Sequence, residues 1–343
     1  MQFSSVIMVL AVLILVSLPC AVAERETWRA LHLIDYQSDQ LLEVLGKQIP
    51  TLAEMGINVI ILEVNYGFNF ESHPELRGPS APITKQGAEK LVRTCREHGI
   101  KLIPQFQCLG HQSWEGNTYK LLTEYPEFDL TPGAFPGNEG IYCREWDPLN
   151  PKVNEIVFRL MDELIEAFQA KEFHVGMDEV FLLGDEHSPS TKGKDPAKLF
   201  AKAVNDYHDH IVKKRGLQML MWGDRLIDGT KMKYGKWESS RNGTAPAVDM
   251  IPKDIIICDW HYNRRREYLS IPMFLEKEFR VLPASWNRVT ATEALIRYAK
   301  QQEHPNMLGH LFTTWGAVNR GDLPAFEPMV KGLEILMADE KTR

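Results

Sequence analysis

TKQGAEKLVRTCREHGIKLIPQF, residues 84–106, joins a helix to a strand through a single glycine. Residues 84–98 have the amphipathic periodicity of a helix. Gly99 follows, at the position where a glycine in the left-handed conformation commonly ends a helix. The run 100–106 is short and largely apolar, as expected of a buried strand. A helix that feeds directly into such a strand is typical of the repeating unit of a parallel sheet.

The same unit recurs along the chain, and Gly56 and Gly216 occupy the position of Gly99 in two other repeats. Eight strands are predicted, at 29–35, 57–64, 100–106, 172–177, 217–222, 254–260, 279–286 and 307–314. Helices are predicted at 38–55, 84–98, 151–170, 195–215, 264–277, 291–302 and 325–337. Only the stretch 223–253 lacks a clear helix.

Eight repeats predict an α/β fold, a (β/α)8 TIM barrel in a single domain over residues 24–343. A doubly wound sheet would need fewer strands and usually has a glycine-rich turn after the first one, and none follows Asp35. The long segments 65–83, 107–150 and 223–253 follow the second, third and fifth strands. They should lie on the C-terminal face, where barrel enzymes build their sites.

Residues 1–23 are interpreted as a signal peptide. The uncharged apolar run 6–18 is shorter than the roughly 20 residues that span a bilayer, and Ala21-Val22-Ala23 has the form of a cleavage site. We therefore expect a secreted or periplasmic protein with no membrane association after cleavage.

The composition argues against several partners and cofactors. The net charge of −7 comes without a basic stripe, so a nucleic-acid partner is not expected. The spacing of Cys95, Cys108, Cys143 and Cys258 matches no zinc pattern, and such scattered cysteines are more often buried thiols than disulfides. No metal and no organic cofactor is expected, and the oligomeric state is left open. A formal glycosylation sequon begins at Asn242.

The predicted strand ends carry carboxylates, amides and four of the eight tryptophans. An indole at a barrel mouth can pack against the C–H face of a pyranose, while carboxylates and amides bind the ring hydroxyls. A carbohydrate is therefore the expected ligand. The residues concerned are Asp35, Glu63, Asn65, Gln105, Gln107, His111, Asp178, Glu179, Trp222, Asp224, Trp260, Tyr262, Trp286 and Trp315.

The sequence His174-Val175-Gly176-Met177-Asp178-Glu179 ends the fourth strand. Two adjacent carboxylates repel each other, which is expected to raise the pKa of at least one of them. A continued strand would send the two side chains to opposite faces. The strand must therefore end or turn here if Asp178 and Glu179 serve one site.

This motif resembles the His-x-Gly-x-Asp-Glu hallmark of family 20 glycoside hydrolases, the β-N-acetylhexosaminidases. The matching segments include Arg29 before His32-Leu33, residues 70–76, Leu109-Gly110-His111, residues 147–151 and Met221-Trp222-Gly223-Asp224. The likeness spans nearly the whole chain after residue 23. It is similar to the short, hexosaminidase D-like branch, because the separate N-terminal domain of longer members is missing.

The resemblance implies hydrolysis of terminal β-linked N-acetylhexosamine with retention, through an oxazolinium intermediate formed by the substrate's own acetamido group. Asp178 would orient that group, and Glu179 would act as the general acid and base. Independently of the resemblance, a histidine inside a barrel is more often a hydrogen-bonded structural residue than a catalytic one, so His111 and His174 are expected to tether Glu179 or to support the barrel top without touching the sugar. The implied substrate-binding residues are Arg29, Trp222, Asp224, Trp260, Tyr262, Trp286 and Trp315.

The sequence departs from the family at two points. Thr313-Thr314-Trp315-Gly316 supplies no carboxylate after the last strand, which puts recognition of the distal hydroxyls in question. Met177 takes the place of the small residue that often precedes Asp-Glu in the family. Two other functions stay open: a glycosidase that pairs Glu179 with Glu63 or Asp224 and acts on sugars without an acetamido group, and a carbohydrate-binding barrel without activity.

Overall fold

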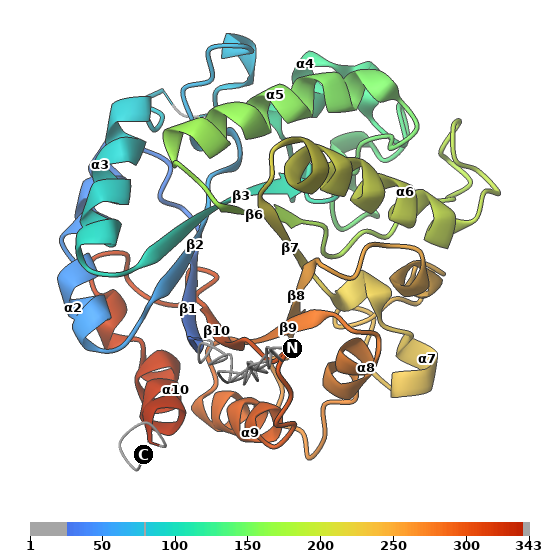
Figure 1. The fold of residues 1–343 in the computed structure, drawn as a ribbon. Helices are drawn as coiled ribbons and strands as arrows, with labels where there is room; N and C mark the ends of the chain where they lie inside the picture. The colour runs from blue at the N-terminus through green and yellow to red at the C-terminus, as the bar shows by residue number, and fades with distance from the viewer. Residues whose placement is uncertain (1–25, 79, 339–343) are drawn as a thin grey trace, which may run out of the picture.

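A computed structural model describes residues 26–78 and 80–338, and its eight long strands close into a parallel barrel (Figure 1). The order around the barrel is β1-β10-β9-β8-β7-β6-β3-β2. The strands are β1 (Trp28–Leu33), β2 (Val59–Glu63), β3 (Lys101–Cys108), β6 (Glu172–Gly176), β7 (Gln218–Trp222), β8 (Ile256–Trp260), β9 (Arg280–Ser285) and β10 (Gly309–Thr313). The predicted (β/α)8 barrel is confirmed, whereas the proposed signal peptide, residues 1–23, lies outside the described residues.

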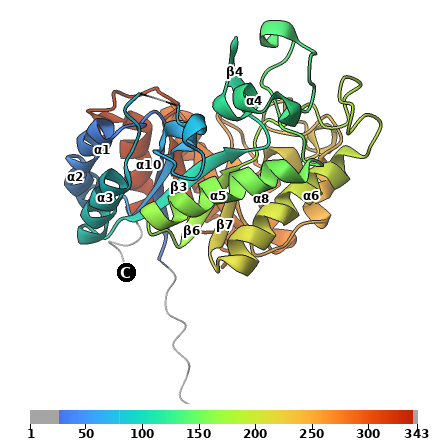
Figure 2. The same cartoon turned by 90° about the horizontal axis from the view of Figure 1, so that it is seen from above.

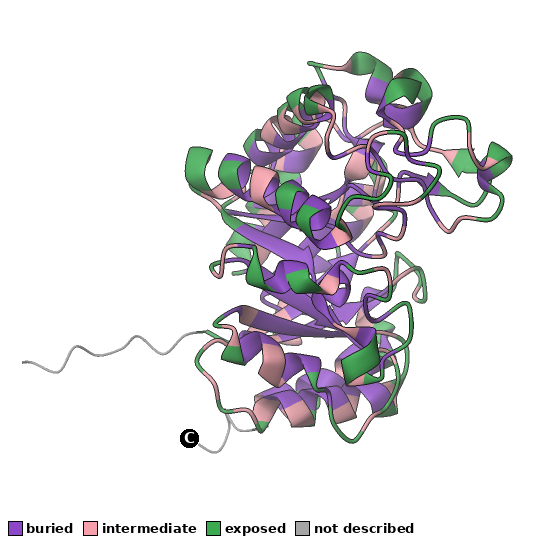
Figure 3. Cartoon of the chain, turned by 90° about the vertical axis from the view of Figure 1, so that its right-hand side faces the viewer, coloured by how far each residue is buried: buried purple, intermediate pink, exposed green. Residues whose placement is uncertain are grey.

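Helices surround the ring of strands and cover its outer face (Figure 1). They are α1 (Asp39–Gly46), α2 (Ile49–Glu54), α3 (Lys85–Glu97), α5 (Pro151–Ala167), α6 (Pro196–His208), α8 (Ser270–Glu276), α9 (Val289–Lys300) and α10 (Glu327–Met337). Figure 3 shows buried strands, with the exposed residues on the outer sides of the helices and on the loops. Within residues 26–78 and 80–338, no helix combines the length and apolar character that a membrane crossing requires.

Prolines explain two differences from the predicted helices. The predicted helix 38–55 is two helices, because Pro50 lies in the first turn of α2, a position where its missing N–H is not needed. The predicted helix 264–277 begins only at Ser270, since Pro272 is tolerated in the first turn of α8 but would break a helix that had begun at 264. The stretch 223–253 contains the single-turn α7 (Gly229–Met232) among 3-10 turns.

The barrel interior is packed, and it becomes polar towards the strand ends. Its apolar layer includes Ala30, Val59, Ile61, Ile103, Leu220, Trp222, Ile256, Cys258, Leu282, Ala284 and Leu311. Above this layer, His32 Nε2 lies 3.0 Å from Gln105 Oε1, and both side chains are fully buried. Cys95, Cys108, Cys143 and Cys258 are free, buried thiols.

The long segment after β3 forms a small unit above the barrel rim. It contains the short hairpin of β4 (Ser113–Trp114) and β5 (Asn117–Thr118), followed by α4 (Lys120–Glu124). Figure 2 shows β4 and α4 standing out beyond the barrel. This small unit therefore projects above the strand ends on the β3 side of the barrel.

Candidate active site

The turn after β6 brings Asp178 and Glu179 to the same place. The strand ends at Gly176, and the backbone takes positive φ values at Gly176 (67°), Met177 (78°) and Glu179 (52°). A Cβ on Gly176 would lie 2.0 Å from Gln107 Oε1, so glycine is required there. The fully buried Met177 packs behind the turn. The predicted break in the strand is thus present, and it allows both acids to face one site.

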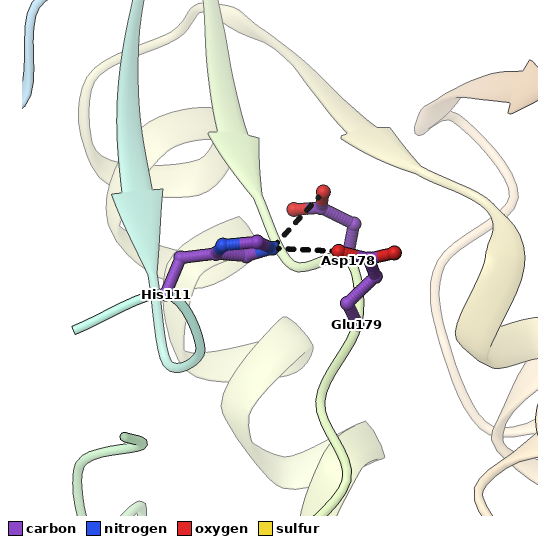
Figure 4. A group of neighbouring side chains, drawn as sticks. All are labelled: His111, Asp178 and Glu179. Carbon is purple, nitrogen blue, oxygen red and sulfur yellow. Dashed lines mark ion pairs between the residues drawn. The ribbon is translucent and has the colours of Figure 1, made fainter. Parts of the chain in front are cut away.

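His111, from the loop after β3, points one ring nitrogen at both acids from the same side (Figure 4). Its Nε2 is 3.4 Å from Asp178 Oδ2 and 3.2 Å from Glu179 Oε2. Burial alone would lower the pKa of His111, but the carboxylates outweigh burial and hold the pKa well above its ordinary value. The imidazolium therefore neutralises part of the repulsion between the acids.

The pKa of Asp178 is lowered, whereas the sequence alone predicted that repulsion would raise a pKa in this pair. Burial would indeed raise it, but the charge of His111 and the hydrogen bonds from His111 and Gln107 outweigh burial. Gln107 Nε2 donates to Asp178 Oδ1 at 2.5 Å. Asp178 is therefore held as a carboxylate.

A chain of amides on β3 links Asp178 to Glu63, at the end of the neighbouring strand β2. Gln105 Nε2 lies 3.3 Å from Gln107 Oε1 and donates to Glu63 Oε2 at 2.7 Å. Burial and the nearby Asp178 raise the pKa of Glu63 to about 7. Glu63 is partly exposed, so it is a further carboxyl group near Asp178 that can face a ligand.

Asp224 lies beneath the turn and does not face the open mouth. It is 1% exposed, its Oδ2 accepts from Glu179 N (2.9 Å) and Arg225 Nε (2.6 Å), and its Oδ1 accepts from Trp260 Nε1 (3.2 Å). Burial raises the pKa of Asp224 to about 6, although Arg225 opposes this. This corrects the predicted sugar contact, since both oxygens are already used to position Glu179 and Trp260.

Four of the predicted aromatic residues form one wall on the β8–β10 side. Trp315 Nε1 donates to Tyr262 Oη at 2.6 Å, and the Tyr262 ring stacks on Trp260 with centroids 4.8 Å apart. Trp286 adjoins Tyr262 at 5.5 Å. Burial raises the pKa of Tyr262 well above its ordinary value, so its hydroxyl keeps its proton. The wall offers ring faces and one hydroxyl donor.

Trp222 and His174 form the floor under this wall. Both are fully buried, and their rings pack with centroids 4.8 Å apart. His174 Nδ1 accepts a hydrogen bond from Gly176 N at 3.0 Å. Burial, and then His32, lower the pKa of His174 well below its usual value, so it is neutral. His174 thus supports the turn through this hydrogen bond.

The structure contradicts the prediction that Arg29 binds the substrate. Ala30 and His32 point into the barrel, so alternation turns Arg29 outward at the N-terminal end of β1. Its Nε donates to Gly56 O, in the loop that leads into β2. The strand ends that hold the acids lie at the opposite end of the barrel, and Arg29 does not reach them.

Sequence reasoning missed two residues of the long loop after β3. Tyr142 hydrogen-bonds to Glu179 through its side chain, and its ring lies 5.5 Å from that of His111. Cys143 Sγ lies 3.5 Å from His111 Nδ1. A loop has no periodicity that could have identified either residue.

The chain that follows the acids is also fixed from other segments. Glu145 Oε1 accepts hydrogen bonds from the backbone N–H groups of Phe181 and Leu182. Asn242, the predicted sequon asparagine, donates from Nδ2 to Val180 O at 3.0 Å. The side-chain amide of Asn242 therefore helps to hold the active-site turn in place.

His111, Asp178 and Glu179 also form the single group of three ligand-type side chains found close together among the described residues. One atom from each lies within 4.8 Å of the other two. A metal ion would need the lone pair of His111 Nε2, which carries a proton when the imidazole is charged. The arrangement fits an ion-pair triad with the proton in place of a metal.

Comparison with known sequences agrees with this geometry. The sequence model of a family described as glycosyl hydrolase family 20, catalytic domain, matches residues 30–319. A lacto-N-biosidase of Bifidobacterium bifidum is 24% identical over 204 residues, 56% of this chain and 17% of that protein. Hexosaminidase D of Bos taurus is 26% identical over 193 residues, 54% of this chain and 51% of that protein. The alignments therefore cover about half or less of these relatives.

Solved structures share the barrel. A chitobiase of Flavobacterium johnsoniae superposes with a TM-score of 0.64 at 19% identity, covering 92% of this chain and 52% of that one. Dispersin B superposes with a TM-score of 0.54 at 18% identity, covering 91% of this chain and 99% of that one. At these identities the likeness establishes the fold alone.

Proposed function

The chain belongs to glycosyl hydrolase family 20, and from this premise we propose that it is a β-N-acetylhexosaminidase that removes terminal β-linked GlcNAc or GalNAc with retention. The observation that carries the proposal is the triad of His111, Asp178 and Glu179, with contacts of 3.4 and 3.2 Å. Asp178 is buried and accepts from Gln107, whereas Glu179 is partly exposed, so the two adjacent acids have different environments, as two different roles require.

In the proposed first step, the acetamido oxygen of the substrate attacks the anomeric carbon, and the glycosidic oxygen leaves. An intramolecular attack gains from a high effective molarity, so no protein nucleophile is needed. Asp178 would accept a hydrogen bond from the acetamido N–H and stabilise the positive charge that develops there. The lowered pKa of Asp178 supports this role, because a protonated carboxyl group has no negative charge with which to stabilise the developing positive charge.

Glu179 would give its proton to the leaving oxygen, and the resulting carboxylate would then take a proton from the water that opens the oxazolinium ring. Its backbone N–H is fixed by Asp224, and its carboxyl group contacts His111 and Tyr142. Unlike Asp224, Glu179 is partly exposed, so it can reach both the leaving oxygen and the incoming water.

Tyr262 would donate its hydroxyl proton in a hydrogen bond to the acetamido oxygen, and its raised pKa keeps that proton available. Trp260, Trp286 and Trp315 would surround the acetamido methyl group and the sugar face. Because no carboxylate lies next to Trp315, Glu63 is the acidic group that we propose for binding distal hydroxyls.

The experiment compares the mature protein on a chromogenic N-acetyl-β-glucosaminide and on the plain β-glucoside. Glu179→Gln and Asp178→Asn should each lower kcat/KM on the acetamido substrate by about 10²- to 10⁴-fold. Glu186→Gln, an exposed carboxylate outside the site, is the matched control and should change little.

Each alternative predicts a different outcome. Turnover of the plain glucoside that survives Asp178→Asn would favour a two-carboxylate glycosidase. Folded protein that binds glycans but turns over neither substrate would favour a binding barrel. The buried Asp224 argues against its use as a second catalytic carboxylate.

Export is a separate part of the proposal and depends on residues 1–23 alone. Expression of the full chain in a secreting host, followed by N-terminal sequencing of the exported protein, tests it. A mature terminus at Glu24 is expected, and retention of an uncleaved chain in the cell would contradict it.

A further inference from the structure

Two tryptophans next to the site are exposed to solvent. Trp114 in β4 is 48% exposed, and Trp237 in the segment after β7 is 39% exposed. Both pack against Tyr142, with ring centroids 5.7 and 4.8 Å apart. Phe181 completes the cluster, at 5.7 Å from Trp237. We call Trp114, Tyr142, Phe181 and Trp237 the outer aromatic cluster.

The outer aromatic cluster begins at the proposed general acid. Tyr142 hydrogen-bonds to Glu179, and Phe181 follows Glu179 by two residues. From the partly buried Tyr142 and Phe181 the cluster leads outward to the exposed indoles of Trp114 and Trp237. It is therefore a continuous path from the proton donor to solvent.

The cluster and the aromatic wall around Tyr262 lie over different sectors of the barrel mouth. The residues of the cluster come from segments that follow β3, β6 and β7, whereas the wall comes from β8, β9 and β10. Figure 1 shows β3 and β6 across the barrel from β9 and β10. A proton donor must contact the leaving oxygen, so the leaving group has to extend on the side of Glu179 away from the wall.

The exposed rings are suited to a sugar. Trp114 and Trp237 meet Tyr142 edge to face, at interplanar angles of 77° and 65°, so these contacts do not stack face on face. Lys236 Nζ lies 4.5 Å from the centroid of the Trp237 ring and covers one of its faces. The free indole faces can take the C–H face of a pyranose, and tryptophan is among the residues that contribute most when such contacts are buried.

We infer that the outer aromatic cluster binds a sugar residue of the leaving group, so that the preferred substrates are N-acetylhexosamines linked to a further sugar. The inference rests on the proposed function, because it needs Glu179 as the proton donor. It adds that Trp114 and Trp237 determine the leaving-group specificity while contributing nothing to recognition of the N-acetylhexosamine itself.

The test compares substrates whose leaving groups have similar basicity. These are methyl N-acetyl-β-glucosaminide, in which nothing reaches the cluster, and trisaccharides with terminal GlcNAc linked β-1,4 to GlcNAc or β-1,3 to galactose. Trp114→Ala and Trp237→Ala should each lower kcat/KM on the trisaccharides by about tenfold, mainly through KM. Hydrolysis of the methyl glycoside should stay within about twofold of the unmodified protein.

Two further variants act as controls. Trp237→Phe keeps a flat ring and should retain most of the trisaccharide activity. Met250→Ala removes a similarly exposed apolar side chain, 42% exposed, outside the cluster and should have no effect.

The outcomes separate this inference from the proposed function. Equal losses on both classes of substrate, or no loss on either trisaccharide, would overturn the leaving-group site while the hexosaminidase activity stands. Absence of hydrolysis of every acetamido substrate by the folded, unmodified protein would overturn both.

Discussion

Replacing His111 by glutamine removes the cation that contacts both Asp178 and Glu179. A hydrogen bond to a charged group contributes about 1.5–3 kcal/mol, and 1.36 kcal/mol corresponds to one pKa unit. Burial raises the pKa of Asp178 and His111 lowers it, so this pKa should rise in His111→Gln. Since only ionised Asp178 can assist the acetamido group, activity should begin at higher pH than in the unmodified enzyme.

The assay is kcat/KM against pH for an N-acetyl-β-glucosaminide. The acid limb should move to higher pH by about one to two units, and the plateau should fall by about tenfold or more. His98→Gln, at the exposed end of α3, controls for the substitution itself. An acid limb that stays in place, or moves to lower pH, would refute the ion-pair account of the triad.

Three other substitutions test the structure. Gly176→Ala should lower the free energy of unfolding by about 1–3 kcal/mol and abolish most activity, because φ of residue 176 is 67° and the new Cβ would collide with Gln107. Denaturant unfolding measures the first effect and kcat the second. Burial lowers the pKa of His261, but Asp259 and the other partners of His261 outweigh burial and raise this pKa to about 9. Protonated His261 should therefore contribute its full stabilisation below about pH 6.5, and this contribution should be lost as the pH rises through 9. Unfolding midpoints at pH 6, 8 and 10 should show this decline, and His261→Asn should flatten it; an unchanged decline would contradict the assignment. Arg29→Ala should leave kcat/KM within about twofold, since Arg29 faces Gly56, and a large loss of activity would restore it to the substrate site.

The strands could be predicted because their signals are local. Gly56, Gly99 and Gly216 all have positive φ, as the helix ends require, and the apolar run that follows each glycine is an observed strand. The helix errors had local signals too. Pro50 and Pro272 were visible in the sequence, and their missing N–H groups could have moved both boundaries.

The site was predictable only where it depends on strand ends. Asp178, Glu179 and the wall tryptophans follow strands directly, so the barrel fold itself brings them together. Tyr142 and Trp237 lie deep in long loops, and sequence spacing carries no information on which strand end they approach. The prediction that Arg29 binds the substrate was wrong for a different reason. The alternation of side chains along a strand, if applied, would have shown that Arg29 and His32 face opposite sides of β1.

The central claim is that the acetamido oxygen of the substrate is the nucleophile and that Asp178 assists it. Its most direct test is a series of aryl β-glucosaminides carrying acetyl, fluoroacetyl, difluoroacetyl and trifluoroacetyl groups on the nitrogen. Fluorine withdraws electrons from the amide oxygen, so kcat/KM should fall steeply along the series, and Asp178→Asn should reduce that dependence. Rates that do not change with fluorination would mean that another group attacks the anomeric carbon, and the account of this site would be wrong.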